Sequence, residues 1–325
     1  MIDFSKFSNI ISLTSYFVSN AICKQAIVES RWADGNIICP YCGKHHCKKS
    51  KSGRFHCTAC NHNFSCLVGT IFENTKLPLI KWFVAMYLIS SHKKGISSHQ
   101  LARDLHITQS AAWYMLQKRR KLYAQSDADA LEGTVECDEV YIGGKEKWKH
   151  KSMHTPHTQG RSTKTKTPVF GMMERNTFIN EYGELENTSY VRAIVVENTN
   201  KSTLQPIIEQ FVDYGSRVIT DELNAYNGLS ELGYFHAVVR HGVAEYANGD
   251  IFTNSIEGFW SHFRRMISGC YHDVSDEHLQ SYIDEAVYRW NTRKASQSER
   301  FYDMFAKSIG IVKRWEDIKV GLMAA

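Results

Sequence analysis

The amino-acid sequence predicts a multidomain protein in which a small cysteine-rich ribbon and a helical domain precede an α/β domain built on a mixed sheet. Three observations predict this. The chain has 325 residues, which is enough for two or more domains. Two Cys-x-x-Cys pairs lie close together near its start, and after residue 133 helical patterns give way to β-rich runs. We expect an N-terminal helix and ribbon over 1–72, a helical domain over 73–130, the α/β domain over 131–300 and a helical tail over 301–325.

Composition and charge exclude several classes of protein. Hydrophobic residues make up 43% of the chain and charged residues 22%, so we expect a sizeable core rather than disorder. There is no run of about 18 apolar residues and no secretory signal pattern, so we expect a cytoplasmic protein with no membrane partner. The net charge of +5 permits nucleic-acid binding without requiring it. Two basic clusters, within 44–54 and 145–166, favour a polyanionic partner over two merely solvated faces.

The cysteine spacing predicts a metal site. Cys39 and Cys42 form one Cys-x-x-Cys pair, Cys57 and Cys60 form another, and 14 residues separate the pairs. This spacing is typical of a tetrahedral zinc ribbon. The alternative is two buried or disulfide-bonded pairs, which a reducing cytosol disfavours. Because four thiolates leave no open position for water, the expected Zn²⁺ is structural.

The helical domain has the pattern of a helix-turn-helix. A helix is expected over 79–89 after Pro78, and residues 95–113 read as two short helices around a tight turn. Ser97 or Ser98 would cap the first of these and Thr108 the second. In a helix-turn-helix the second helix enters the major groove of DNA, although an ordinary helical hairpin would show much the same pattern. The basic run at the far end of the second helix adds three expected DNA contacts: Lys118, Arg119 and Arg120.

The α/β domain is predicted from five β-rich runs with a helical segment over 203–212 between the third and the fourth. The runs cover residues 134–142, 168–173, 190–196, 217–221 and 237–239. Three strands, a helix and two further strands indicate a mixed sheet covered by helices.

Two aspartates in this domain are candidate metal ligands. Asp138 and Asp221 lie in or just after apolar strands, where an uncompensated charge is expensive. Two strand carboxylates with a third from a helix would form an oxygen-rich site suited to Mg²⁺. Because neighbouring strand residues point to opposite faces, we do not expect Glu139 to share a site with Asp138. Taken singly, each aspartate fits an ordinary surface or turn residue better than a metal ligand.

The third carboxylate is expected from residues 254–267. Their apolar positions form one stripe at helical spacing, with Glu257, Ser261 and Arg264 on the opposite side. That arrangement places a metal-binding carboxylate in line with a cation that could hold a DNA phosphate. The alternative is a capping box, in which Asn254 caps the helix and Glu257 bonds back to its start.

Four blocks together resemble bacterial insertion-sequence transposases of the ISXO2-like group. In order they are residues 31–43, residues 138–144, Thr220 with Asp221, and residues 253–260, and the likeness runs from about residue 20 to 295. The resemblance implies an RNase H-like catalytic domain whose acidic triad binds two Mg²⁺ ions, with Mn²⁺ able to substitute. By match to the blocks the triad is Asp138, Asp221 and Glu257. Some members use asparagine as the third residue, which makes Asn254 the alternative, and Arg264 stands where a lysine is usual.

This resemblance implies DNA transposition by two-metal phosphoryl transfer. The ribbon and the helix-turn-helix would bind the terminal inverted repeats of the element, and a homodimer or larger assembly would act on its two ends and on target DNA, at the bacterial nucleoid. Further phosphate contacts are expected from basic side chains, and these would weaken with added salt. They are Lys147, Lys149, Lys151, Lys164, Lys166 and Arg265.

Two other readings use the same N-terminal features. A ribbon with a helix-turn-helix also describes a DNA-binding regulator, in which substitution of all three acidic residues would leave DNA binding intact. An inactive transposase remnant is a related possibility, although the intact blocks argue against decay. A carboxylate-pair glycosidase explains neither the ribbon nor the basic clusters.

Overall fold

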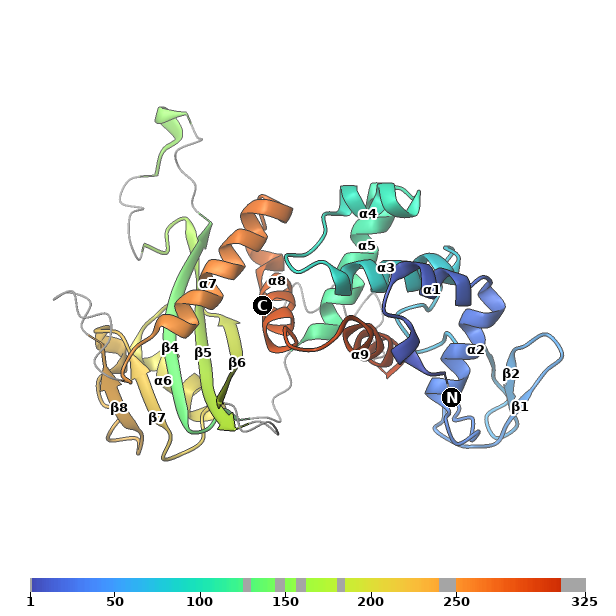
Figure 1. Cartoon of the computed structure of the whole chain (residues 1–325), viewed down its shortest axis with the longest axis horizontal. Coiled ribbons are helices and arrows are strands. Elements are labelled where there is room, and N and C mark those ends of the chain that lie inside the picture. Colours follow the sequence, from blue (N-terminus) through green and yellow to red (C-terminus); the bar gives the residue numbers. More distant parts are fainter. Residues whose placement is uncertain are drawn as a thin grey trace. The chain divides into compact units, whose positions relative to one another are not determined.

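The computed structural model describes residues 2–124, 130–143, 150–155, 162–179, 185–239 and 250–310. These residues belong to two compact units, coloured along the chain in Figure 1. The first unit comprises residues up to Leu122 together with those from Lys294 onward, and the second comprises Tyr123–Arg293. Among the described helices, none is both long and apolar enough to cross a membrane.

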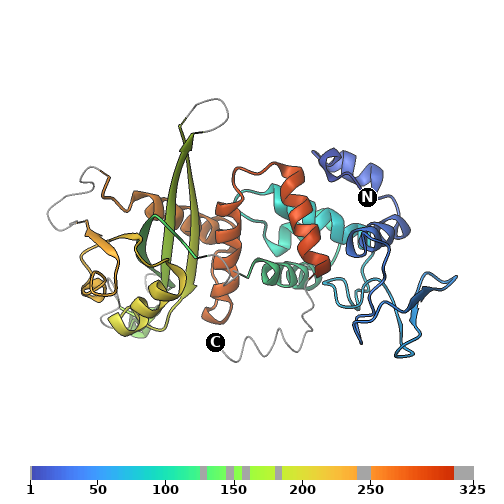
Figure 2. The ribbon, with the colours of Figure 1, turned by 90° about the horizontal axis from the view of Figure 1, so that it is seen from below.

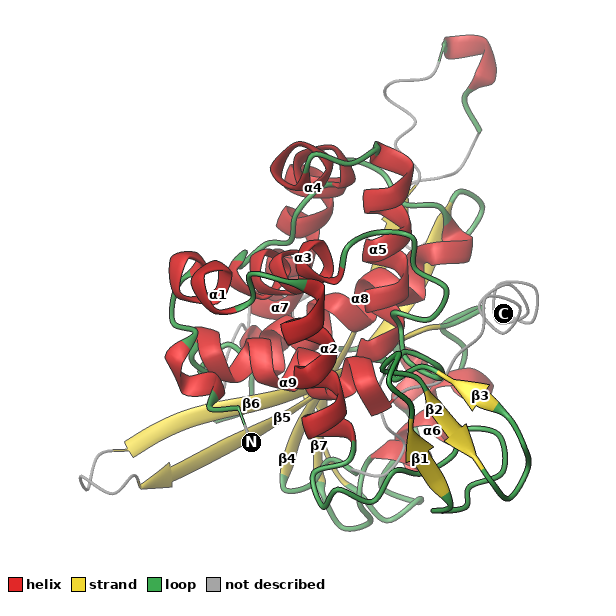
Figure 3. Ribbon diagram, turned by 90° about the vertical axis from the view of Figure 1, so that its right-hand side faces the viewer, coloured by secondary structure: helices red, strands yellow, loops and turns green. Residues whose placement is uncertain are grey.

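The first unit contains the ribbon and most of the short helices. Before the ribbon lie η1 (Phe4–Lys6), α1 (Ile10–Tyr16) and α2 (Asn20–Arg31). The ribbon is an antiparallel sheet in the order β1 (Cys47–Lys49), β2 (Phe55–Cys57) and β3 (Asn63–Phe64), which Figure 3 shows as a small separate sheet. Its inner side is aromatic, because Phe55 stacks on Phe64 at 5.6 Å and Trp32 meets Phe55 edge-on at 5.2 Å.

The helices that follow have the expected helix-turn-helix order. They are α3 (Leu79–Ser91), α4 (Ser98–Leu105) and α5 (Gln109–Arg120), with η2 (Lys121–Tyr123) after them. Ser97 caps α4 by accepting the Gln100 N–H, and Thr108 caps α5 by accepting the Ala111 N–H, which confirms the predicted caps. From the other end of the chain, α9 (Gln297–Gly310) joins this unit through Phe305, whose ring lies 5.4 Å from that of Phe83.

The second unit is built on a five-stranded mixed sheet. Its order is β6 (Leu185–Val195), β5 (Lys166–Ile179), β4 (Thr134–Gly143), β7 (Arg217–Thr220) and β8 (Phe235–Val238). The strands β4, β5 and β6 pair antiparallel, whereas β7 pairs parallel to both β4 and β8. This topology is RNase H-like and confirms the predicted α/β fold class. Short 3-10 turns η4 (Lys151–Met153) and η5 (Asn224–Tyr226) lie in the connections.

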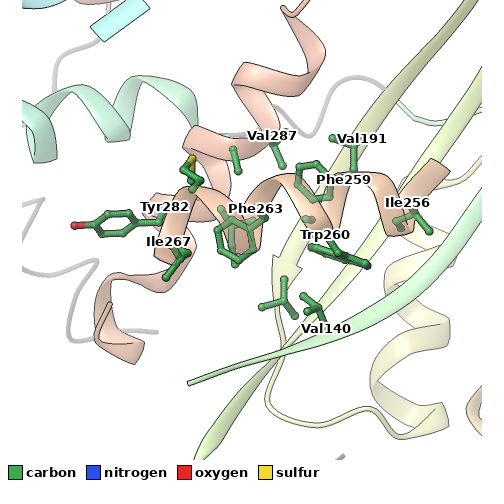
Figure 4. Packing of buried hydrophobic residues seen from close by; sticks show 14 of the residues in the cluster. Val140, Val191, Ile256, Phe259, Trp260, Phe263, Ile267, Tyr282 and Val287 are labelled. Carbon is green, nitrogen blue, oxygen red and sulfur yellow. The ribbon is translucent and has the colours of Figure 1, made fainter. Parts of the chain in front are cut away.

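Helices cover both faces of this sheet (Figures 1 and 2). On one face α6 (Lys201–Phe211) buries Leu204 and Ile208 against Val135 and Phe170. On the other lie α7 (Asn254–Met266), its π-helical end η7 (Ile267–Tyr271), and α8 (Asp276–Asn291). Figure 4 shows the apolar side of α7 facing Val140 of β4 and Val191 of β6. The apolar stripe predicted for 254–267 is therefore the core-facing side of α7.

Candidate functional site

Three carboxylates meet where β4 and β7 run side by side. Glu136 of β4 is in register with Ile219 of β7, so the parallel strands bring Asp138 level with Asp221, the first residue after β7. One oxygen each of Asp138, Glu139 and Asp221 lies within 4.8 Å of the others. Asp221 is also held locally, because one of its carboxylate oxygens accepts the Leu223 N–H at 2.9 Å. The two predicted aspartates are thus brought together.

The expectation that Glu139 would not share this site is wrong. Alternation does place it on the opposite face of β4 from Asp138. However, β7 pairs with β4 only as far as Glu136, so the edge of β4 beyond Glu136 is unpaired and side chains from both faces can meet over it. The hydroxyl of Tyr226, buried under the sheet, donates to the Glu139 carboxylate and holds it there.

The electrostatics of Asp138 favour a bound cation. Burial, together with the nearby charges of Asp221 and Glu257, raises the pKa of Asp138 to about 6, against the lowering effect of the Glu139 N–H. Like charges held this close repel each other unless a counter-ion lies between them. Carboxylate oxygens are the ligands that Mg²⁺ prefers, so the donor set fits that ion.

Glu257 lies in the first turn of α7 with an exposed side chain, close enough for its charge to affect Asp138 but outside the three-carboxylate group. The capping-box alternative is wrong for Asn254, because Thr253 is the N-cap residue of α7 and Asn254 is already helical. Glu257 does reach back to the helix start, where its carboxylate accepts the Thr253 hydroxyl at 3.5 Å. Asn254 is exposed at the rim of a cavity of about 550 Å³ that Ser255 and Gly258 also line.

The polar side of α7 is arranged as its spacing predicts. Glu257, Ser261 and Arg264 are all exposed, and so is Arg265 next to them. Residues four and three apart share one side of a helix, so a carboxylate and a guanidinium project from the same side of α7.

Glu136 is a site residue that the sequence reasoning missed. It is fully buried, accepts the Ile256 N–H at 2.9 Å, and forms an ion pair with Arg175 whose Nε lies 3.0 Å away. Burial raises its pKa, against the effect of these partners. Arg175 in turn covers the ring of Phe252 at 4.0 Å. The available signal was period-two alternation, which puts Glu136 on the same face of β4 as Asp138.

The four predicted zinc ligands converge in the ribbon. Their sulfur atoms lie within 4.8 Å of one another, with Cys39 Sγ 3.6 Å from Cys60 Sγ and Cys42 Sγ 3.7 Å from Cys57 Sγ. All nine cysteines are free thiols, so the disulfide alternative is wrong. Burial opposes ionisation of Cys57, but the N–H groups of Cys60 and Ala59 lower its pKa to about 6. Four such sulfurs fit a tetrahedral Zn²⁺.

Several basic side chains that were predicted to contact DNA are buried in the structure. Lys118, Arg119 and Arg120 are 9%, 2% and 1% exposed, and the Lys118 ammonium donates to the Ile71 carbonyl at 3.0 Å. This corrects the expectation of three surface cations, since the end of α5 is buried. Lys164 is exposed and Lys166 half-buried at the start of β5. Lys147, Lys149 and the side chain of Lys151 lie outside the described residues.

Comparisons with known proteins agree with this arrangement. A model of the ISXO2-like transposase domain matches residues 130–291, and a transposase zinc-ribbon model matches residues 19–63. An uncharacterized protein of the transposable element ISH50 from Halobacterium salinarum is 28% identical over 278 residues, covering 82% of this chain and 89% of that protein. A transposase-like protein from Haemophilus influenzae is 31% identical over 101 residues, covering 31% of this chain and 80% of that protein.

Among solved structures, a crystal structure of the Mos1 strand transfer complex overlaps with 70% of this chain and 78% of that chain. The identity is 14% and the TM-score 0.28. The family rests instead on the sequence matches and on the sheet that brings the aspartates together. The chain belongs to the ISXO2-like family of insertion-sequence transposases.

Proposed function

We propose that this transposase binds the terminal inverted repeats of its insertion sequence and cleaves and joins DNA strands by two-metal phosphoryl transfer. The observation that carries the proposal is the meeting of Asp138 and Asp221 at the open edge of β4, with Glu257 of α7 close enough for its charge to act on Asp138. Asp138, Glu139 and Asp221 form an acidic, oxygen-only group inside the region matched by a transposase domain.

Each residue has a separate role in the proposed reaction. Asp138, Asp221 and Glu257 hold two Mg²⁺ ions, or Mn²⁺ in their place, and Glu139 adds a carboxylate oriented by Tyr226. When bound, two such ions lower the pKa of an attacking water or DNA 3′-hydroxyl and stabilise the leaving oxygen. Arg264 holds a phosphate of the strand beside the carboxylates, with a guanidinium in place of the usual lysine ammonium.

DNA recognition is assigned to the first unit. In a helix-turn-helix, residues at the start of the second helix read base edges, and Gln109 and Ser110 are exposed at the start of α5. Structural Zn²⁺ would hold the ribbon through its four cysteines. Cutting at two element ends calls for a homodimer or larger assembly, and the nucleoid in the cytoplasm is where the substrate lies.

The direct test is cleavage of labelled DNA that carries the element's own end. We expect nicking at the repeat boundary that requires Mg²⁺ and that Asp221→Asn reduces by at least about 100-fold, because one ligand of an essential metal site is lost. Glu222→Gln is the matched control, since this neighbouring acid lies outside the carboxylate group, and it should cleave normally. Specific binding by the wild type without cleavage, in Mg²⁺ or Mn²⁺, would overturn the proposal in favour of a DNA-binding regulator.

A further inference from the structure

A glycine in β5 lies directly opposite Asp138. Gly171 pairs with Asp138 across β4 and β5, and it is in ordinary extended backbone, so its conformation does not require glycine. Space does. A Cβ atom at this position would lie 2.4 Å from Cζ2 and 2.8 Å from Cη2 of Trp260, and 3.1 Å from Cδ1 of Ile256. The missing side chain therefore leaves a notch in the sheet that the indole of Trp260 fills.

The indole that fills this notch carries a polar group with no protein partner of normal geometry. Trp260 is only 3% exposed, and its Nε1 is buried without a completed hydrogen bond among the described residues. A buried N–H group without an acceptor loses the hydrogen bonds that water would make to it, so such groups are rare and usually lie near an acceptor. Cζ2 is bonded to the ring carbon that carries Nε1, which places the N–H at the Gly171–Asp138 pair.

The acceptor that lies near this N–H is the Asp138 carboxylate. Asp138 is the register partner of Gly171, so a ring seated on Gly171 lies beside the Asp138 side chain on the same face of the sheet. The Trp260 side chain is in turn among the hydrogen-bond donors that act on the Asp138 carboxylate. Trp260 also lies one turn after Glu257 on α7. Figure 4 shows its ring pointing from α7 toward β4 beside Val140. One side chain thus connects the strand that carries Asp138 with the helix that carries Glu257.

We propose that Trp260 is a positioning residue for the metal site. Its indole N–H donates to one Asp138 oxygen and leaves the other directed at the ion, while the Gly171 notch sets how closely α7, and with it Glu257, approaches β4. This inference rests on the proposed function. Carboxylates that bind metals are commonly held by such outer hydrogen bonds, and their loss weakens metal binding by about 10–100-fold.

The first test compares Trp260→Phe with Phe263→Leu. The first variant removes the N–H and keeps an aromatic ring in the notch, and the second removes core volume from the same face of α7. Mn²⁺ binding to the protein without DNA is measured by the loss of the free-ion electron paramagnetic resonance signal, and the thermal midpoint is recorded without metal. We expect about ten-fold weaker Mn²⁺ binding for Trp260→Phe and unchanged binding for the less stable Phe263→Leu. Equal Mn²⁺ affinity in wild type and Trp260→Phe would overturn the inference.

A second pair of variants keeps the indole in place. Gly171→Ala puts a methyl group into the notch and displaces Trp260, so it should also weaken Mn²⁺ binding. Gly269→Ala, at a helical glycine with open space around it, is the control and should bind like the wild type. If the wild type itself bound no Mn²⁺, the proposed function would fail together with this inference. Normal wild-type binding with unchanged Trp260→Phe and Gly171→Ala would reject the positioning role alone.

Discussion

Two acidic residues on one face of β4 have opposite environments. Asp138 is partly exposed at the open edge of the strand and near other carboxylates, whereas Glu136 is fully buried and neutralised by Arg175. The pairing of β4 with β7 ends at Glu136, and the start of α7 lies over this residue, because the Glu136 carboxylate accepts the Ile256 N–H. Glu136 therefore holds the start of α7 against the sheet through a hydrogen bond, whereas the Asp138 carboxylate remains available to a metal ion.

Loss of the Glu136 charge should destabilise the second unit without removing a ligand. In Glu136→Gln the amide oxygen still accepts the Ile256 N–H, but Arg175 loses its charged partner in a buried site. We expect the free energy of unfolding to fall by about 2 kcal/mol, less than for a fully buried pair because Arg175 keeps its bond to the Asp250 carbonyl. Urea unfolding measures this. The exposed Glu132→Gln is the control, and equal stability of the two variants would contradict the role of the ion pair.

At the scale of elements, the ribbon and the sheet are stabilised by different means. The three ribbon strands have two or three residues each, too short to bury a core of their own. Four convergent cysteines supply the missing stability when a metal ion is bound. The five-stranded sheet instead has an apolar cluster on each face.

Chelation of Zn²⁺ should therefore unfold the ribbon selectively. After treatment with a strong chelator we expect rapid hydrogen exchange in β1, β2 and β3 and unchanged protection in β4, β5 and β6, because metal binding and ribbon folding are one equilibrium. Exchange followed by mass spectrometry of the corresponding peptides measures this. Cys57→Ser should behave like the chelated wild type, and Cys23→Ser, at a cysteine outside the cluster, should not. Protection of the ribbon that survives metal removal would exclude a structural zinc site.

At the scale of the whole molecule, the net charge of +5 understates the cations available to DNA. Between its two cysteine pairs the ribbon exposes five basic side chains and contains no acidic residue. The five are Lys44, Lys48, Lys49, Lys51 and Arg54. The second unit exposes Arg264 and Arg265 on α7. The cations at the end of α5 are buried and add nothing to this set.

Removal of ribbon cations should change the salt dependence of DNA binding. For Lys48→Gln with Lys49→Gln we expect the slope of log K against log salt to become shallower by about two, because each phosphate contact contributes about 0.9. Fluorescence anisotropy with labelled repeat DNA at several salt concentrations measures the slope. Lys6→Gln, at an exposed lysine in η1, is the matched control. A slope that the double variant leaves unchanged would place the ribbon away from the DNA backbone.

Several features of the fold and of the site follow from local sequence patterns. Cysteine spacing defined the zinc ribbon, serine and threonine caps located α4 and α5, and helical spacing gave the apolar and polar sides of α7. Ordered motifs identified the family, and strand patterns placed Asp138 and Asp221 where a mixed sheet brings them together. Such features are readable because each is set by residues a few positions apart.

Other features depend on how far two strands pair and on how helices pack against the sheet. The pairing of β4 with β7 ends at Glu136, which lets Glu139 share a site with Asp138. The docking of α7 on the sheet brings the Ile256 N–H, in the first turn of α7, to the Glu136 carboxylate. Packing likewise buries the basic end of α5, which looks like a surface in sequence, and requires a glycine opposite Asp138. These outcomes depend on contacts between residues far apart in the chain, which no local pattern encodes.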